Sequence, residues 1–103
     1  MRQFDVFRNP SKASAKYAPF LVVLQSSLTL TETTVVVAPL VLPDRLPVAS
    51  RLFPRVKVGT RAVVLSTNEL GAIGRPHLKE RVGNLESERD TIIAAIDMLF
   101  SGF

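Results

Sequence analysis

Two short runs of β-branched residues constrain the fold more than any other feature of the sequence. PFLVVLQ (residues 19–25) and TTVVVAPLVL (residues 33–42) are long enough for strands and short for helices. Pro39 lies inside the second run. Because a proline cannot donate a hydrogen bond to a strand ladder, we expect this strand to lie at a sheet edge or to contain a bulge.

Alternating residues predict further strands on both sides of these runs. In QFDVF (residues 3–7), a period of two places Phe4 and Val6 inward and the other three residues outward. A weaker strand, interrupted by glycines, is expected within NELGAIGRP (residues 68–76).

A hairpin is predicted around Gly59-Thr60. Before this pair, RVKVG (residues 55–59) places Val56 and Val58 on one face. After it, AVVLST (residues 62–67) forms the return strand. The chain therefore contains five or six short strands with mostly local connections. This pattern predicts a mainly β fold, a small barrel or a strongly bent sheet.

Two irregular segments connect the strands. RNPSKASAK (residues 8–16) is polar, basic and without periodicity, and is expected to be a mobile loop. LPDRLPVASRLFP (residues 42–54) contains three prolines and is expected to be a loop with one turn of helix around residues 49–52.

The end of the chain predicts one α-helix. Ser87 followed by Asp90 is typical of a capping box, with Asp in the place usually taken by Glu or Gln. Gly102 is expected to cap the C-terminus of the helix. Apolar residues follow at helical spacing, which indicates one buried stripe. This stripe consists of Ile92, Ile96, Leu99 and Phe103, widened by Ile93 and Phe100.

Composition narrows the class of protein. A length of 103 residues predicts a single domain over residues 1–103, and 47% hydrophobic content is enough for a core. The absence of cysteine excludes disulfides, and a single histidine, His77, makes a zinc site implausible. The longest apolar run is too short to cross a bilayer. We expect a cytoplasmic protein without metal or cofactor and without a membrane partner.

Charge is unevenly distributed along the sequence. The net charge is +4, from thirteen basic and nine acidic residues. Five of the acidic residues lie in the last 24 positions, whereas Arg51, Arg55, Lys57 and Arg61 form a stretch without an acid. Such a surface attracts an acidic partner, either protein or nucleic acid. An ordinary solvated face explains it about equally well.

Catalysis finds little support among the residues. Nucleophilic catalysis needs a base beside the nucleophile, and His77 lies in what is expected to be an exposed turn. One alternative stays open, because small barrel toxins can cleave RNA with Arg, Ser and Thr alone. The stretch Arg51–Arg61 followed by Ser66-Thr67 could stabilise the transition state of that reaction. Nucleic-acid binding is weakly supported, since only Phe53 supplies an aromatic ring near these charges.

Taken as a whole, the sequence resembles the CcdB toxins of bacterial toxin–antitoxin modules. Four segments carry the resemblance by their order and spacing, and the ending Phe-x-Gly-apolar is its strongest part. These segments are QFDVF, VVVAPLV, RLFPRVKVG and LESERDTIIAAIDMLFSGF. The resemblance implies a small SH3-like β-barrel, or bent antiparallel sheet, closed by one C-terminal helix.

The resemblance also implies a function and partners. CcdB toxins are homodimers that bind the A subunit of DNA gyrase and trap its complex with cleaved DNA. A partly disordered antitoxin neutralises them, and the toxin reaches operator DNA only through that antitoxin, with which it represses the operon. A basic toxin suits such an acidic partner. No catalytic residue is implied.

Site residues follow from the resemblance position by position. The best-known members end Phe-Trp-Gly-Ile, and the Trp stacks on gyrase arginines. Gyrase binding is therefore expected at Phe100, Ser101, Gly102 and Phe103, with Ser101 in the place of the Trp. The dimer interface is expected to include Leu99 and Phe103. Antitoxin contacts are expected at Arg8, Lys12, Arg45, Arg51 and Arg55.

Three hypotheses remain open on the sequence alone. The first is a dimeric gyrase poison that acts by binding, and the replacement of Trp by Ser101 counts against it. The second is a toxin of the same fold that cleaves RNA, and the lack of a base counts against it. The third is an inactive relative that retains only antitoxin binding and operon autoregulation.

Overall fold

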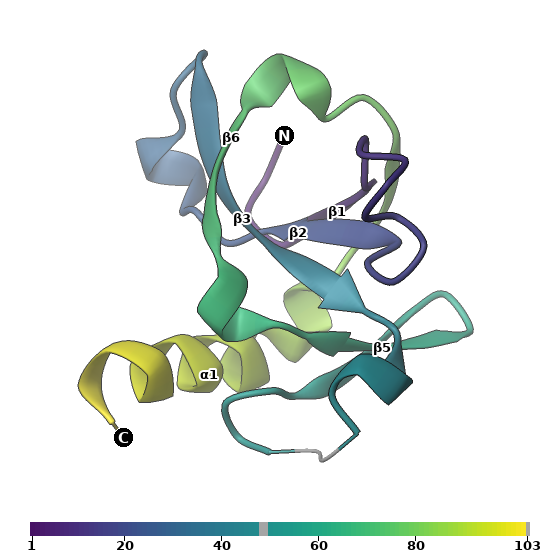
Figure 1. Ribbon diagram of the computed structural model, residues 1–103. Coiled ribbons are helices and arrows are strands. Elements are labelled where there is room, and N and C mark those ends of the chain that lie inside the picture. Colours follow the sequence, from purple (N-terminus) through teal and green to yellow (C-terminus); the bar gives the residue numbers. More distant parts are fainter. Residues whose placement is uncertain (48–49, 103) are drawn as a thin grey trace.

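The computed structural model describes residues 1–47 and 50–102. Within them, a seven-stranded antiparallel sheet precedes one α-helix (Figure 1). The elements are β1 (Asp5–Arg8), β2 (Phe20–Val23), β3 (Thr34–Val41), β4 (Arg55–Val58), β5 (Arg61–Leu65), β6 (Gly71–Gly74), β7 (Arg81–Asn84) and α1 (Arg89–Ser101).

The sheet bends into a half-barrel. Its strand order is β4-β5-β3-β2-β1-β7, with β6 pairing to β3, and β7 at one end comes beside β4 at the other. Helix α1 lies across the open end, where Ile92 and Ala95 are fully buried. The mainly β fold closed by one C-terminal helix is confirmed. The predicted strands are also confirmed, and β7 is the strand that sequence reasoning missed.

Pro39 lies in the middle of the sheet and in unbroken register with β2, so the prediction of an edge position or a bulge is wrong. On one side of β3, Pro39 pairs with Leu21 of β2. On the other side, β6 pairs with residues 34–37 and β5 with residues 40–41. Pro39 therefore falls where the neighbouring strand changes, and its carbonyl accepts from the Ser66 backbone N–H at 2.9 Å. The missing N–H costs no ladder bond at this junction.

Strands β1 and β2 bury side chains on both faces. Phe4 and Val6 belong to the inner core, as predicted, together with Phe20 and Val22 of β2. Phe7, predicted to point outward, is only 6% exposed. It belongs to a second cluster on the outer face, with Leu21, Val23, Val35, Val37 and Leu78. Coverage of both faces explains why β2 is apolar at every position.

The predicted hairpin is confirmed. Val58 pairs with Arg61, which leaves Gly59 and Thr60 as the two-residue turn. Gly59 has a φ of +63°, in the left-handed region that a two-residue hairpin turn requires. Val56 is buried and Lys57 is exposed, as the alternation predicts.

The two ends of α1 differ in how well the sequence predicts them. The helix begins after a 3₁₀ turn, Glu86–Glu88, and its N-cap residue Glu88 makes no side-chain capping bond. The predicted Ser87–Asp90 capping box is therefore wrong. Instead, Asn84 Oδ1 accepts from the Glu86 backbone N–H at 2.7 Å and caps the preceding turn. The C-cap is confirmed, because Gly102 has a φ of +77° and donates to the Met98 carbonyl.

Hydrogen bonds fix the loop between β1 and β2, which was expected to be mobile. Asn9 Nδ2 donates to Ser14 Oγ at 2.9 Å and to the Ala18 carbonyl at 2.8 Å. The loop after β3 contains a 3₁₀ turn, Pro43–Arg45. The helical turn predicted around residues 49–52 lies partly outside the described residues.

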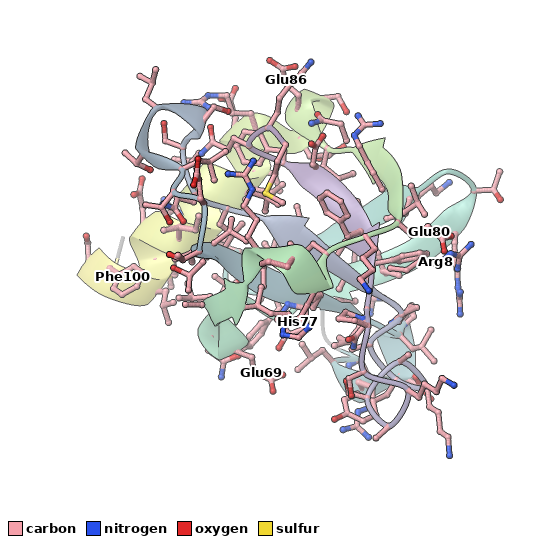
Figure 2. All side chains as sticks on the ribbon, turned by 90° about the horizontal axis from the view of Figure 1, so that it is seen from above. Arg8, Glu69, His77, Glu80, Glu86 and Phe100 are labelled. Atoms are coloured by element: carbon pink, nitrogen blue, oxygen red, sulfur yellow. The ribbon has the colours of Figure 1, made fainter. Side chains whose placement is uncertain are left out.

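Strand β7 is tied to β1 by charged side chains. At one end, Arg8 forms an ion pair with Glu80, which directly precedes β7 (Figure 2). The first residue of β7 makes the second contact, because Arg81 Nε donates to Asp5 Oδ1 at 2.8 Å. The Arg81 side chain is half exposed, whereas that of Asp5 is 3% exposed.

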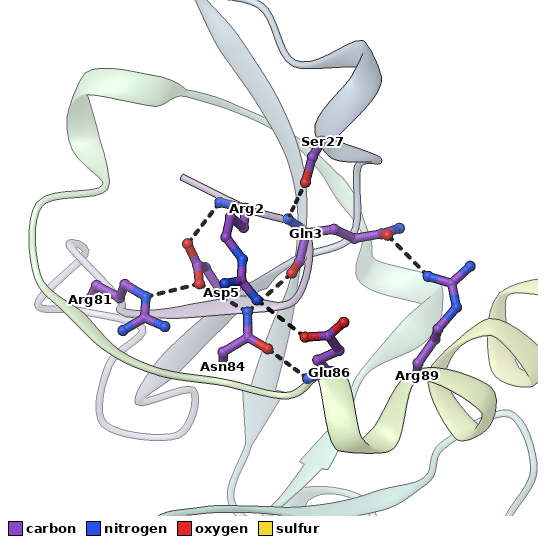
Figure 3. Close-up of polar contacts among 8 residues, drawn as sticks. All are labelled: Arg2, Gln3, Asp5, Ser27, Arg81, Asn84, Glu86 and Arg89. Carbon is purple, nitrogen blue, oxygen red and sulfur yellow. Dashed lines mark hydrogen bonds and ion pairs between the residues drawn. The ribbon is translucent and has the colours of Figure 1, made fainter.

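Asp5 is the centre of a polar network that fixes the N-terminus (Figure 3). Its Oδ1 also accepts from Asn84 Nδ2 at 3.0 Å, and its Oδ2 accepts from the Arg2 backbone N–H at 2.8 Å. Burial on its own would raise the pKa of Asp5, but hydrogen bonds from Asn84, Arg81 and Arg2 outweigh it and lower that pKa. The ionised carboxylate therefore stabilises the fold.

Replacing Asp5 should weaken the fold and change its response to acid. The lowered pKa of Asp5 gives its full stabilisation well above the unfolded-state pKa of about 3.9. This stabilisation is lost as the pH falls through the pKa of Asp5 in the folded protein. We expect Asp5→Asn to lower the free energy of unfolding at pH 7 by roughly 1.5–3 kcal/mol, because charged hydrogen bonds are lost.

Urea unfolding at a series of pH values down to about 2 tests this expectation. The difference between wild type and Asp5→Asn should shrink below about pH 4. A difference that stays constant with pH would contradict the role assigned to the Asp5 charge.

Candidate functional site

The last turns of α1 expose large apolar side chains. Ile92 and Ala95 are fully buried, and Ile93 and Ile96 pack against the same core. Beyond them the helix extends past the sheet (Figure 1). Phe100 is 71% exposed there, at the outer end of the helix (Figure 2), and Met98 is 36% exposed.

An apolar groove lies beside Phe100. It has a volume of about 360 Å³ and is lined by Leu24, Gln25, Val36, Leu70 and Ile96 together with Phe100. These residues come from the segment after β2, from β3, from the segment before β6 and from α1. The groove and the exposed ring form one apolar surface at the end of the helix, which we call the helix-end surface. Exposed apolar surface of this kind marks interaction sites.

Three of the four predicted gyrase-binding residues lie at the end of α1, beside the helix-end surface. Phe100, Ser101 and Gly102 are all exposed at the end of α1. The left-handed conformation of Gly102 terminates the helix directly after Ser101. Leu99, predicted for the dimer interface, is half-buried on the same turn. Phe103 lies outside the described residues.

A second surface gathers positive charge. Arg55 pairs with Val64 across the β4–β5 hairpin, so the two side chains share a face. Val64 packs with Ala18, Val41, Leu46 and Phe53. Ala18, Leu46 and Phe53 therefore place their loop segments on the face that carries Arg55.

One stacking contact joins the two loops on this basic face. The guanidinium of Arg45 lies 4.1 Å from the centroid of the Tyr17 ring, and the Leu42 backbone N–H donates to the Tyr17 carbonyl at 2.8 Å. Lys12 and Arg51 are exposed within these loops. Arg55 donates to the Pro47 carbonyl at 2.7 Å. Of the five predicted antitoxin contacts, the structure brings Lys12, Arg45, Arg51 and Arg55 onto these neighbouring segments.

Arg8 differs from the other four because its charge is paired with Glu80. Tyr17 and Met98 are surface residues that sequence reasoning missed. A lone tyrosine directly after Lys16 was the available signal for Tyr17. The helical periodicity did not show that the last turns of α1 extend past the sheet, which leaves Met98 exposed.

The hydroxyl groups considered for RNA cleavage are engaged elsewhere. Ser66 and Thr67 are 2% and 0% exposed. Ser66 Oγ donates to Glu69 Oε1 at 2.6 Å, and Thr67 Oγ1 donates to the Leu52 carbonyl at 2.6 Å. These bonds shape the turn between β5 and β6. His77 is exposed in a 3₁₀ turn, as predicted (Figure 2).

Comparison with known proteins identifies the family. Within residues 1–47 and 50–102, no helix is long and apolar enough to cross a membrane. No curated protein matches the sequence. The family model described as CcdB protein matches residues 3–102, which is nearly the whole chain. The half-barrel with its closing helix agrees with the fold expected from the resemblance. The chain therefore belongs to the CcdB family, whose members are toxins of toxin–antitoxin modules that act on DNA gyrase.

Proposed function

We propose that this protein poisons DNA gyrase by binding the A subunit with its helix-end surface and trapping the complex with cleaved DNA. The observation that carries the proposal is the exposure of Phe100, at 71%, beside an apolar groove. Transfer of an aromatic side chain this exposed from water into a partner's pocket lowers the free energy, which favours binding. Ser101, Gly102 and Phe103 complete the proposed contact.

Phe100 takes over the role of the family's tryptophan in this proposal. A phenylalanine face attracts a guanidinium less strongly than an indole does, but it attracts it by the same mechanism. Met98 adds a polarisable side chain that adapts to an irregular surface. Together they supply the apolar area that Ser101 does not.

The toxin acts by binding rather than catalysis in this account. The family acts on gyrase without catalytic chemistry of its own, and the Ser66 and Thr67 hydroxyls are buried in structural bonds. Gyrase itself cleaves the DNA, and the bound toxin stabilises the complex of gyrase with the cleaved DNA. The protein therefore works in the cytoplasm, where its target lies.

Two further assignments belong to the same proposal. The protein forms a homodimer whose interface includes Leu99 and Phe103, beside the helix-end surface. A cognate antitoxin binds the basic face through Arg8, Lys12, Arg45, Arg51 and Arg55. The uneven distribution of charge supports this second assignment, since an acidic chain is attracted to that face. Operator DNA is reached through the antitoxin.

Replacing Phe100 should abolish poisoning without unfolding the protein. Purified toxin, gyrase from the native host, supercoiled plasmid and ATP are incubated and denatured, and linear DNA is measured. We expect Phe100→Ser to reduce linear DNA by about tenfold or more, as for a central anchor of an interface.

Leu28→Ser is the matched control, because Leu28 is 96% exposed, lies in the turn Ser27–Thr29, and does not line the groove beside Phe100. It should leave the yield of linear DNA unchanged. Equal loss in both variants, or no loss in Phe100→Ser, would contradict the assignment of the helix-end surface.

The backbone at Gly102 should matter for poisoning through its left-handed conformation. A Cβ added at Gly102 would meet nothing within 4 Å, so there is space for a side chain. However, the φ of +77° at this position strains a β-branched residue by about 1–2 kcal/mol. We expect Gly102→Val to raise the toxin concentration needed for half-maximal cleavage several-fold.

Gly102→Asn is the control for this prediction, since asparagine adopts the left-handed region more readily. It should remain close to wild type in the same titration, and thermal unfolding should verify that both variants are folded. Equal activity of the two variants would show that the helix cap does not position the binding residues.

A further inference from the structure

Among the side chains of residues 1–47 and 50–102, a single hydrogen bond joins helix α1 to a residue outside the helix. Arg89, the first residue of α1, donates through Nη1 to Gln3 Oε1 at 3.3 Å (Figure 3). The same guanidinium lies 5.7 Å from the centroid of the Phe4 ring. Both contacts reach the short segment before β1, so this segment and the start of α1 are held together.

Apolar packing holds the middle of α1 on the sheet. Ile92 and Ala95 are fully buried, and Ile93 and Ile96 pack against the same core. Burial of apolar area is not directional, so it holds a helix in place without sharply defining its rotation about its own axis. Packed helices can therefore shift slightly against their neighbours. A hydrogen bond depends on direction, and can favour one of these positions over the others.

Arg89 and Phe100 lie on the same side of α1. They are eleven residues apart, which is close to three helical turns and roughly 16 Å along the axis. Ile92, Ile93 and Ile96 lie between them on that side and pack against the core. A rotation of the helix that displaces Arg89 therefore displaces Phe100 in the same direction.

Gln3 joins this bond to the groove beside Phe100. Its Nε2 donates to the Leu24 carbonyl at 2.9 Å, and Leu24 lines the groove. Its Oε1 accepts from Arg89, on the helix that carries Phe100. One side-chain amide therefore contacts both the segment that forms one side of the groove and the helix that forms the other.

The backbone of Gln3 is itself held in place. Its N–H donates to Ser27 Oγ at 3.0 Å, and its carbonyl accepts from Asn84 Nδ2 at 3.1 Å (Figure 3). The residue is therefore bonded at its backbone and at both ends of its amide before any partner binds. A contact that is ordered in advance lowers the free-energy cost of association.

We propose that Arg89 and Gln3 are positioning residues, which set the rotation of α1 so that Phe100 lies beside the groove in the position that gyrase binds. The proposal rests on the proposed gyrase function and assigns to it two residues outside the helix-end surface. Arg89 lies at the opposite end of α1 from Phe100, so it acts through the helix and not by contact with gyrase.

The toxin concentration needed for half-maximal DNA cleavage by gyrase tests the proposal. Arg89→Met removes the donor but keeps an unbranched side chain beside the Phe4 ring. It should raise that concentration by about two- to tenfold. The yield of linear DNA at saturation should stay unchanged, because the same complex forms once gyrase is fully occupied. Arg89→Lys keeps a cationic donor and should remain within about twofold of wild type.

A double replacement tests whether Arg89 acts through Gln3. Gln3→Ala removes both side-chain bonds and should raise the half-maximal concentration at least as much as Arg89→Met does. Adding Arg89→Met to Gln3→Ala should cause no further rise, since the bond between the two residues is already absent. A further rise as large as that of Arg89→Met alone would show that Arg89 acts elsewhere, and would overturn the proposal.

Arg2→Met is the matched control. Arg2 Nη2 also donates one exposed bond, to Glu86 Oε2 at 3.2 Å, but Glu86 lies in the turn before α1. The variant therefore removes the same charge and a bond of similar length without releasing the helix. It should leave the half-maximal concentration unchanged. Equal rises in Arg2→Met and Arg89→Met would indicate a general effect of charge on gyrase binding, and would overturn the positioning role.

Thermal unfolding separates positioning from loss of stability. Arg2→Met and Arg89→Met should lower the Tm by similar small amounts, since each loses one exposed bond. All variants should be folded at the temperature of the cleavage assay. Half-maximal concentrations that simply follow the Tm across the variants would indicate a purely structural role, and would overturn the proposal.

The outcomes also separate this proposal from the proposed function. Cleavage by wild type together with a raised half-maximal concentration in Arg89→Met, but not in Arg89→Lys or Arg2→Met, supports the positioning role. Cleavage by wild type with an unchanged half-maximal concentration in Arg89→Met overturns that role and leaves the gyrase function standing. Absence of cleavage by wild type would overturn both.

Discussion

The rest of the fold depends on strand β3, because three other strands pair with it. Along one side it pairs with β2, and along the other side first with β6 and then with β5. The change of neighbour at Pro39 allows the sheet to bend into a half-barrel. The bend creates an inner face that α1 covers and an outer face that carries the second apolar cluster. The groove beside Phe100 includes Val36 of this strand.

The position of α1 on the inner face determines what the protein can bind. The helix is anchored through Ile92 and Ala95, and its last turns extend beyond that anchor. The anchored helix therefore exposes Phe100 and Met98 at the surface proposed for gyrase binding. This arrangement suits a toxin that acts by occupying a site on a large enzyme, since the contact is already formed before binding. The basic face is built from separate loops and leaves this end free.

Much of the fold could be predicted from the sequence because its signals are local. The β-branched runs, the Gly59-Thr60 turn and the Gly102 cap each depend on a few neighbouring residues. Strand β7 could not be predicted in this way. Its sequence, RVGN, contains one large apolar residue, and an ion pair to Asp5, 76 residues away, helps to hold it.

The failures share a physical cause, which is tertiary contact. Phe7 is buried because Leu78 and other distant residues cover the outer face. Asn84, and not Ser87, caps the turn before α1, since the chain enters the helix through a 3₁₀ turn. The helix-end residues were predicted by resemblance to the family. The register of β6, with Gly71 opposite Val37, depends on pairing between strands that are far apart in the sequence, which no local pattern shows.

Direct binding to gyrase tests the central claim most sharply. The A subunit of gyrase from the native host is immobilised, and wild-type protein is compared with a chain that lacks residues 100–103. The account predicts saturable binding of the wild type and none of the shortened chain, with both chains folded by circular dichroism. Absence of wild-type binding, or equal binding by the shortened chain, would contradict it.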